Sequence, residues 1–119
     1  MSLIIGRSGE TRVVLPVEAV TQTFALLGMR GSGKTTAAVV LVQEMVAAGQ
    51  PVVIVDPVGV WYGIRSSADG KEPGLPVVIF GGDHADVPLD EGGGALLAQY
   101  LVTARVPAVL DLSRLRKGA

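Results

Sequence analysis

The sequence predicts an α/β fold with a mostly parallel sheet, and two observations carry this prediction. Short apolar segments alternate along the 119 residues with helical or loop segments, a pattern typical of parallel strands joined by crossovers. Residues 23–56 also contain one complete strand, loop, helix and strand in succession. Almost half of the residues are hydrophobic and 18% are charged, so the composition indicates a buried core rather than disorder.

The start of the chain predicts two short strands, Leu3 to Ile5 and Arg12 to Leu15, joined by a turn at Ser8-Gly9. Pro16 to Val20 then predicts a short helical turn. Together these residues form an N-terminal β-hairpin with a lead-in to the rest of the chain.

The central unit begins with the apolar run Thr23 to Leu27, which predicts a buried strand. Lys34 to Ala48 contains no Gly or Pro and is followed by Gly49, so it predicts a helix that ends at a glycine. The helix is apolar nearly all round, so we expect it to be buried on more than one side. Pro51 to Asp56 predicts the next parallel strand, reached by a right-handed crossover.

The remaining elements follow the same pattern of strands alternating with other segments. Residues 57–76 are rich in Gly, Ser and Pro and predict loops. The predicted elements after them are a strand from Pro76 to Phe80, a helix from Ala95 to Thr103 and a strand from Pro107 to Leu112.

The loop between the first parallel strand and the helix carries the chemistry. Gly28-Met29-Arg30-Gly31-Ser32-Gly33-Lys34-Thr35 fits the P-loop pattern G-x-x-x-x-G-K-[ST] at every fixed position. Its glycines let backbone N–H groups turn toward phosphate oxygens, and the start of a helix adds its dipole to the anion site. The sequence therefore predicts that a nucleoside triphosphate binds with Mg²⁺ through Gly28, Met29, Arg30, Gly31, Ser32, Gly33, Lys34, Thr35 and Thr36.

Within this loop Lys34 is the predicted catalytic residue, because its ammonium can reach the β- and γ-phosphates. The Thr35 hydroxyl is the predicted Mg²⁺ ligand. Asp56 and Asp111 each end an apolar run, and neither is followed by the Glu that many ATPases use as a base. Asp56 is a candidate for a metal contact through water, and Asp111 is a weaker candidate of the same kind.

Other residues point to chemistry less specifically. His84 is the only histidine, and a polar loop explains it better than a metal site, because zinc sites need three or four protein ligands. Trp61 and Tyr62 are better explained as side chains that anchor a loop to the core than as side chains that stack on a nucleotide base.

The net charge of the chain is −1, so the chain has no overall attraction to nucleic acid. With no cysteine, no apolar run of membrane-spanning length and no visible signal segment, a cytoplasmic protein is the expectation.

Several segments besides the P-loop carry a family resemblance. They are Ile5-Gly6-Arg7, Leu15-Pro16 to Thr23, Val55-Asp56-Pro57-x-Gly59-x-Trp61-Tyr62-Gly63, Phe80-Gly81-Gly82 and Val109-Leu110-Asp111-Leu112-Ser113. With them the chain resembles the HerA/FtsK-like P-loop ATPases, specifically the HerA-type helicase central domain of the DUF87 group. Thr23 stands where relatives often have His, and Val60 stands where many have an acidic residue.

The resemblance implies a three-layer, RecA-like P-loop NTPase core in which residues 1–22 form the strand pair and lead-in and residues 23–119 form part of the core. It implies a homo-hexameric ring that couples ATP hydrolysis to DNA translocation. It places the Asp-Glu pair of the Walker B strand, the sensor and the arginine finger after Ser113, so the chain corresponds to an N-terminal, incomplete portion of that core. On this basis we expect nucleotide binding with poor hydrolysis by the chain alone.

Two alternative functions remain open from the sequence. The same loop suits a small-molecule kinase, although the downstream arginines are few for a lid that closes over phosphates. The chain could also be a non-catalytic assembly module whose loop holds only phosphate or sulfate. A GTPase is the weakest reading, because no Asn-Lys-x-Asp sequence is present.

Overall fold

A computed structural model describes residues 2–67 and 69–115 of the chain. The chain divides into two compact units, Met1–Gln50 and Pro51–Ala119, and each is considered by itself. The elements of the first unit are β1 (Ser2–Ser8), β2 (Thr11–Pro16), η1 (Val17–Thr21) and α1 (Lys34–Ala47). Those of the second are β3 (Val53–Asp56), η2 (Trp61–Arg65), β4 (Val78–Phe80), α2 (Gly94–Ala104) and β5 (Ala108–Asp111). The predicted domain boundary after residue 22 stays a prediction.

The N-terminal hairpin is present as predicted, with longer strands. β1 and β2 pair antiparallel from Ser2 opposite Pro16 to Ser8 opposite Thr11, with one irregularity between Ile4 and Gly6. Gly9 begins the two-residue turn with a positive φ of 63°, a conformation that favours glycine at the first position of such a turn. The predicted helical turn after the hairpin is also present, as the 3₁₀ helix η1.

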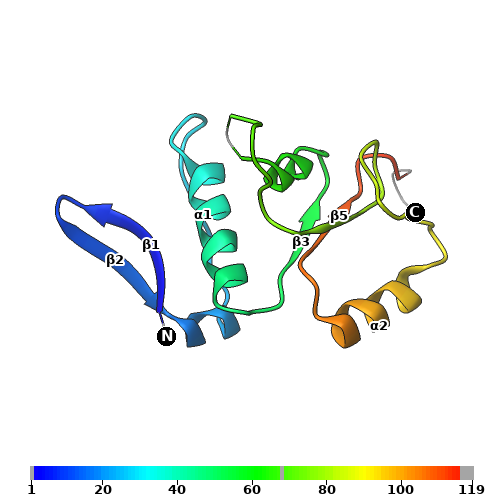
Figure 1. Cartoon of the computed structure of the whole chain (residues 1–119), viewed down its shortest axis with the longest axis horizontal. Helices are drawn as coiled ribbons and strands as arrows, with labels where there is room; N and C mark the ends of the chain where they lie inside the picture. The colour runs from blue at the N-terminus through cyan, green and yellow to red at the C-terminus, as the bar shows by residue number, and fades with distance from the viewer. Residues whose placement is uncertain (1, 68, 116–119) are drawn as a thin grey trace. The chain divides into compact units, whose positions relative to one another are not determined.

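Helix α1 begins and ends close to the predicted residues. Its end is fixed by Gly49, which has a φ of 75° and donates its N–H to the Val46 carbonyl at 3.0 Å. Gln50 donates to the Met45 carbonyl, also at 3.0 Å, so the two bonds form a Schellman motif. The helix lies beside β1 (Figure 1), and Glu44 accepts a hydrogen bond from the Ile4 N–H at 3.3 Å.

The expected burial of α1 on more than one side is wrong, because none of its residues is fully buried. The predicted strand at residues 23–27 is also wrong, since this segment has no regular secondary structure. A strand needs a hydrogen-bonded neighbour, and residues 23–27 belong to neither of the sheets in the described part of the chain. Their side chains remain exposed, with Phe24 at 58% and Leu27 at 90% of full exposure.

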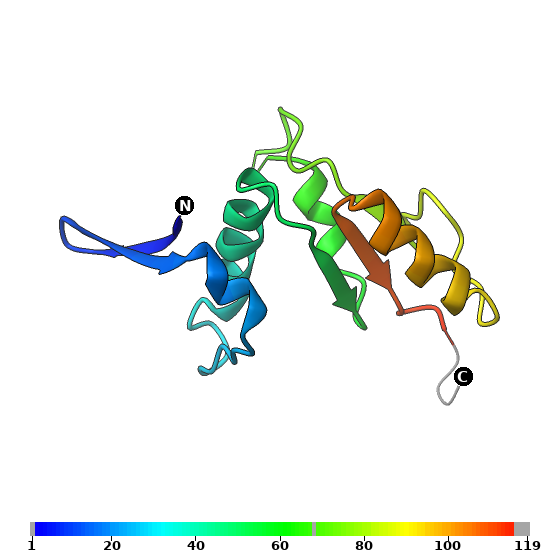
Figure 2. The ribbon, with the colours of Figure 1, turned by 90° about the horizontal axis from the view of Figure 1, so that it is seen from below.

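The second unit contains the parallel sheet that the sequence predicts. Its strand order is β3-β5-β4, and both pairings are parallel. Figure 2 shows the arrows of β3 and β5 running in the same direction. β5 lies in the middle and is the most buried strand, with Ala108 at 0% and Val109 at 1% exposure. Since the strands are parallel, their carboxyl ends meet at one edge of the sheet.

The connections of the second unit differ in how well the sequence predicted them. The predicted helix at residues 95–103 is observed as α2 with one more residue at each end. The segment predicted as loops contains the 3₁₀ helix η2, which places Ile64 in the core. Among the residues that the structure describes, no helix is both long and apolar enough to cross a membrane.

Candidate functional site

The Gly-rich loop before α1 has the backbone shape that a P-loop requires at two glycines. Gly31 and Gly33 have positive φ values of 82° and 94°, which side-chain-bearing residues rarely adopt. Gly33 is the residue immediately before the helix. At Gly28 a Cβ would overlap the Ser32 hydroxyl, which would have to rotate away. The geometry of the loop therefore favours glycine at positions 31 and 33 and leaves little space for a side chain at position 28.

Lys34 opens the helix and turns its side chain back over the loop. Its Nζ donates hydrogen bonds to the carbonyl oxygen of Gly28 at 2.6 Å and to that of Met29 at 3.1 Å. The ammonium is therefore held above the loop by backbone carbonyls.

The start of α1 offers unpaired backbone donors. The first helical bond recorded there runs from the Ala37 N–H to the Gly33 carbonyl, at 2.9 Å. The N–H groups of Lys34, Thr35 and Thr36 precede this bond and have no partner within the helix, as at every α-helix N-terminus. Thr35, Thr36 and Arg30 are exposed, and Met29 is 82% exposed. An anion at this position would meet several N–H donors and the positive end of the helix dipole.

Asp56, at the end of β3, is buried and binds the backbone of the next loop. Its Oδ1 accepts N–H bonds from Val58 at 3.1 Å and Gly59 at 2.9 Å. Its Oδ2 accepts N–H bonds from Val60 and Trp61, both at 2.8 Å. Burial raises the pKa of Asp56, but the four backbone N–H bonds outweigh it and hold the pKa below its ordinary value. The carboxylate thus fixes the Asp-Pro-x-Gly turn, and its contact with a metal through water stays a prediction.

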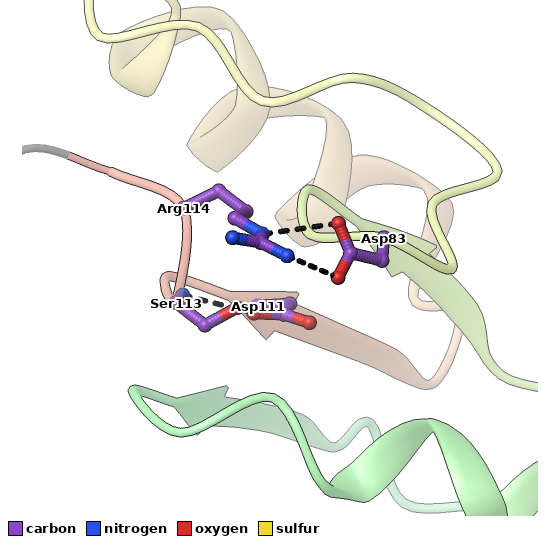
Figure 3. Close-up of polar contacts among 4 residues, drawn as sticks. All are labelled: Asp83, Asp111, Ser113 and Arg114. Atoms are coloured by element: carbon purple, nitrogen blue, oxygen red, sulfur yellow. Dashed lines mark hydrogen bonds and ion pairs between the residues drawn. The ribbon is translucent and has the colours of Figure 1, made fainter.

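Asp111 ends β5 directly opposite Asp56 in the sheet register. Its Oδ1 accepts hydrogen bonds from the Ser113 N–H at 2.9 Å and the Ser113 hydroxyl at 2.5 Å (Figure 3). Gly59 and Gly82, both with positive φ, lie next to the same carboxylate. A Cβ on either glycine would collide with Asp111 or with Ser113. The sequence placed Asp111 at a strand end but gave no sign of these neighbours.

A bidentate ion pair lies beside Asp111. Arg114 donates from Nε to Asp83 Oδ1 at 3.0 Å and from Nη2 to Oδ2 at 2.6 Å (Figure 3). The hydrogen bond from Arg114 holds the pKa of Asp83 below its usual value and raises that of Arg114. These two residues are 31 positions apart, and sequence reasoning missed their pairing.

The loop that carries Asp83 is fixed at its far end by Asp86. The Asp86 carboxylate accepts the Ile79 N–H at 2.9 Å and forms an ion pair with Arg65, also at 2.9 Å. His84 stacks on Tyr62, with ring centroids 3.6 Å apart. The prediction that His84 lies in a polar loop fits this arrangement. In the described parts of the chain, no group of three or more His, Cys, Asp or Glu side chains could hold a metal ion.

The family of the chain follows from a comparison with protein-family models. The model of the helicase HerA central domain matches residues 3–84, more than half of the chain. The chain belongs to this HerA family. The match confirms the resemblance given by the P-loop and the Asp-Pro-x-Gly turn. No curated protein and no solved structure is significantly similar to the chain.

The HerA match covers the P-loop, Asp56 and Asp83, whereas Asp111, Ser113 and Arg114 lie outside it. The HerA match therefore spans the Gly-rich loop and the turn after β3. The grouping of Asp111 with Asp83 and Arg114 is a feature of this structure that the family match does not cover.

Proposed function

We propose that the chain is the nucleotide-binding part of a HerA-type ATPase and binds ATP with Mg²⁺ at residues 28–36. The observation that carries the proposal is the junction of the Gly-rich loop with α1. There Gly31 and Gly33 adopt positive φ values and Lys34 directs its ammonium to the loop. Membership of the HerA family supports the same function.

In this proposal each part of the loop has a separate role. The backbone N–H groups at the start of α1 bind phosphate oxygens, and the Lys34 ammonium neutralises the β- and γ-phosphates. Thr35 is the Mg²⁺ ligand, since its hydroxyl is exposed in the first turn of the helix. Bound Mg²⁺ would neutralise charge that develops on the phosphates during their cleavage.

The wider architecture is also part of the proposal. We propose a three-layer RecA-like core with residues 1–22 as its lead-in, and the parallel order β3-β5-β4 supports it, although residues 23–27 form no strand of that sheet. Assembly into a homo-hexamer and action on DNA follow from the helicase family alone.

We further propose that the chain by itself hydrolyses ATP poorly. Hydrolysis needs a group that positions or activates the attacking water. The Asp56 carboxylate is committed to four backbone N–H groups. Asp111 is bound to Ser113, and neither aspartate is followed by a glutamate.

Titration with a fluorescent ATP analogue, with and without Mg²⁺, tests the binding proposal. Lys34→Ala should weaken binding by at least tenfold, because it removes a positive charge that contacts the phosphates, an interaction of about 1.5–3 kcal/mol. Lys71→Ala is the matched control, since Lys71 is an exposed lysine in another loop. Equal affinities of the wild type and Lys34→Ala would refute the proposal.

Steady-state release of phosphate tests the proposal that the chain alone hydrolyses ATP poorly. The chain alone should release phosphate only at trace rates, and rapid turnover that Lys34→Ala abolishes would contradict poor hydrolysis. ADP formation that depends on one phosphate acceptor would instead identify a small-molecule kinase.

A further inference from the structure

A small polar pocket of about 300 Å³ opens at the carboxyl edge of the parallel sheet in the second unit. Its lining includes Asp83, His84, Asp111, Ser113 and Arg114. The volume is at the lower end of the range of about 300–1,000 Å³ found for small-molecule sites. In open α/β sheets, ligands bind outside the carboxyl ends of the strands. The position of the pocket therefore agrees with a binding role.

One carboxylate oxygen of Asp111 accepts no hydrogen bond from the described residues, although Asp111 is buried. Asp111 is only 3% exposed, and both of its hydrogen bonds from Ser113 go to Oδ1. No donor among residues 2–67 and 69–115 bonds to Oδ2. In the same residues, no fully enclosed polar side-chain atom lacks a partner. Oδ2 is therefore not fully enclosed, and Asp111 is one of the residues that line the pocket.

The charges around this oxygen decide which ligand it suits. Asp83 and Asp111 contribute two negative charges and Arg114 one positive charge, so with His84 neutral the lining carries a net charge of −1. Arg114 is already committed to Asp83 by two hydrogen bonds. A buried carboxylate is stabilised most by a counter-charge, and a neutral ligand would leave its charge uncompensated.

We propose that this pocket binds an alkylammonium or guanidinium group, with its N–H donors on Asp111 Oδ2. The group is either a small organic cation or the basic side chain of a peptide. Hydrogen bonds from such groups to a carboxylate are charge-assisted, and partial burial of the site protects them from water. The pKa of Arg114 is raised, mainly by its hydrogen bond to Asp83 and by the charge of Asp83, with a smaller contribution from the charge of Asp111. This role goes beyond the proposed nucleotide site and does not depend on it.

The only histidine of the chain gives a direct signal for binding. His84 lines the pocket, so its ring C–H signals in an NMR spectrum should move and saturate when a ligand enters. The probe is N-acetyl-arginine methylamide, titrated at fixed pH without nucleotide or Mg²⁺. N-acetyl-citrulline methylamide is the neutral control, because it has almost the same shape without the charge. Putrescine tests a free polyamine as the source of the cation.

Three substitutions make the test specific. Asp111→Asn should abolish saturable binding of the arginine probe. Asp83→Asn should weaken binding and Arg114→Gln should strengthen it, each roughly two- to fivefold, because they change the lining charge in opposite directions. The side chains of Asp83 and Arg114 are 63% and 69% exposed, so both variants should fold even if Asp111→Asn does not. Glu72→Gln, at an exposed site outside the pocket, should leave the affinity unchanged.

The outcomes separate this proposal from its competitors. Binding of the arginine probe or of putrescine that follows the predicted order of variants supports it and identifies the better source. Equal binding of the citrulline probe would overturn it in favour of a neutral ligand. Weaker binding of the arginine probe by Arg114→Gln would overturn it, because the charge of the lining would then not be what attracts the cation. A His84 signal that moves with Mg²⁺ alone and not with the organic cations would overturn it in favour of a metal ion.

Discussion

The replacement of Asp56 by Asn should strongly destabilise the second unit. The carboxylate accepts four backbone N–H bonds between 2.8 and 3.1 Å, two on each oxygen. Asn keeps one oxygen and turns an NH₂ group toward two of the N–H donors. Two charge-assisted bonds are then lost, each worth about 1.5–3 kcal/mol. Allowing for partial access of water, we expect a loss of about 3–5 kcal/mol, a large part of the total of about 5–15 kcal/mol typical of a domain.

Urea unfolding followed by tryptophan fluorescence measures this loss. Trp61 is the only tryptophan and donates its own backbone N–H to Asp56, so it reports on the loop concerned. Glu72→Gln is the control for the loss of a carboxylate charge on the surface, and its unfolding midpoint should hardly move. A loss below about 1 kcal/mol for Asp56→Asn would show that the four N–H bonds contribute little, against the expected value for such bonds.

Two further predictions concern the same edge of the sheet. The four N–H bonds outweigh burial and hold the pKa of Asp56 below 3.8. The contribution of Asp56 to stability is therefore complete above that pH and is lost as the pH falls through the folded pKa. Urea midpoints measured from neutral pH downward should show this loss in the wild type, and a curve of the same shape in Asp56→Asn would contradict it. Gly82→Ala should destabilise the chain by about 2 kcal/mol more than Gly70→Ala. Both glycines have similar positive φ values, but only a Cβ on Gly82 would overlap the Asp111 carboxylate. Equal unfolding midpoints for the two variants would show that this overlap does not affect stability.

The sequence predicted best those elements that local rules determine. Gly49 predicted the end of α1. The apolar runs that end at Asp56 and Asp111 predicted strands of a parallel sheet, and the structure shows them as parallel strands. The short helical turn and the hairpin before it were also correct, because turn residues and alternation act over a few positions. The family was predicted from the P-loop and the Asp-Pro-x-Gly turn, and the family match confirms it.

The errors have a common physical cause. An apolar run such as residues 23–27 can be a strand only if other strands pair with it, and sequence periodicity does not contain that partner. The same holds for the apolar faces of α1, which no part of the first unit fully buries. The contact of Asp83 with Arg114 joins positions 31 residues apart, so it depends on the strand order β3-β5-β4 rather than on any local pattern.

The position of the Lys34 ammonium sets a threshold for any anion that binds the loop. Two of the three N–H donors of the ammonium bond to the carbonyls of Gly28 and Met29, which therefore compete with an anion for the same charge. A single phosphate, with less negative charge and fewer oxygens, would compete with these carbonyls less strongly than a nucleoside triphosphate would. The nucleotide-free loop would thus select its ligand by charge before any contact with the base.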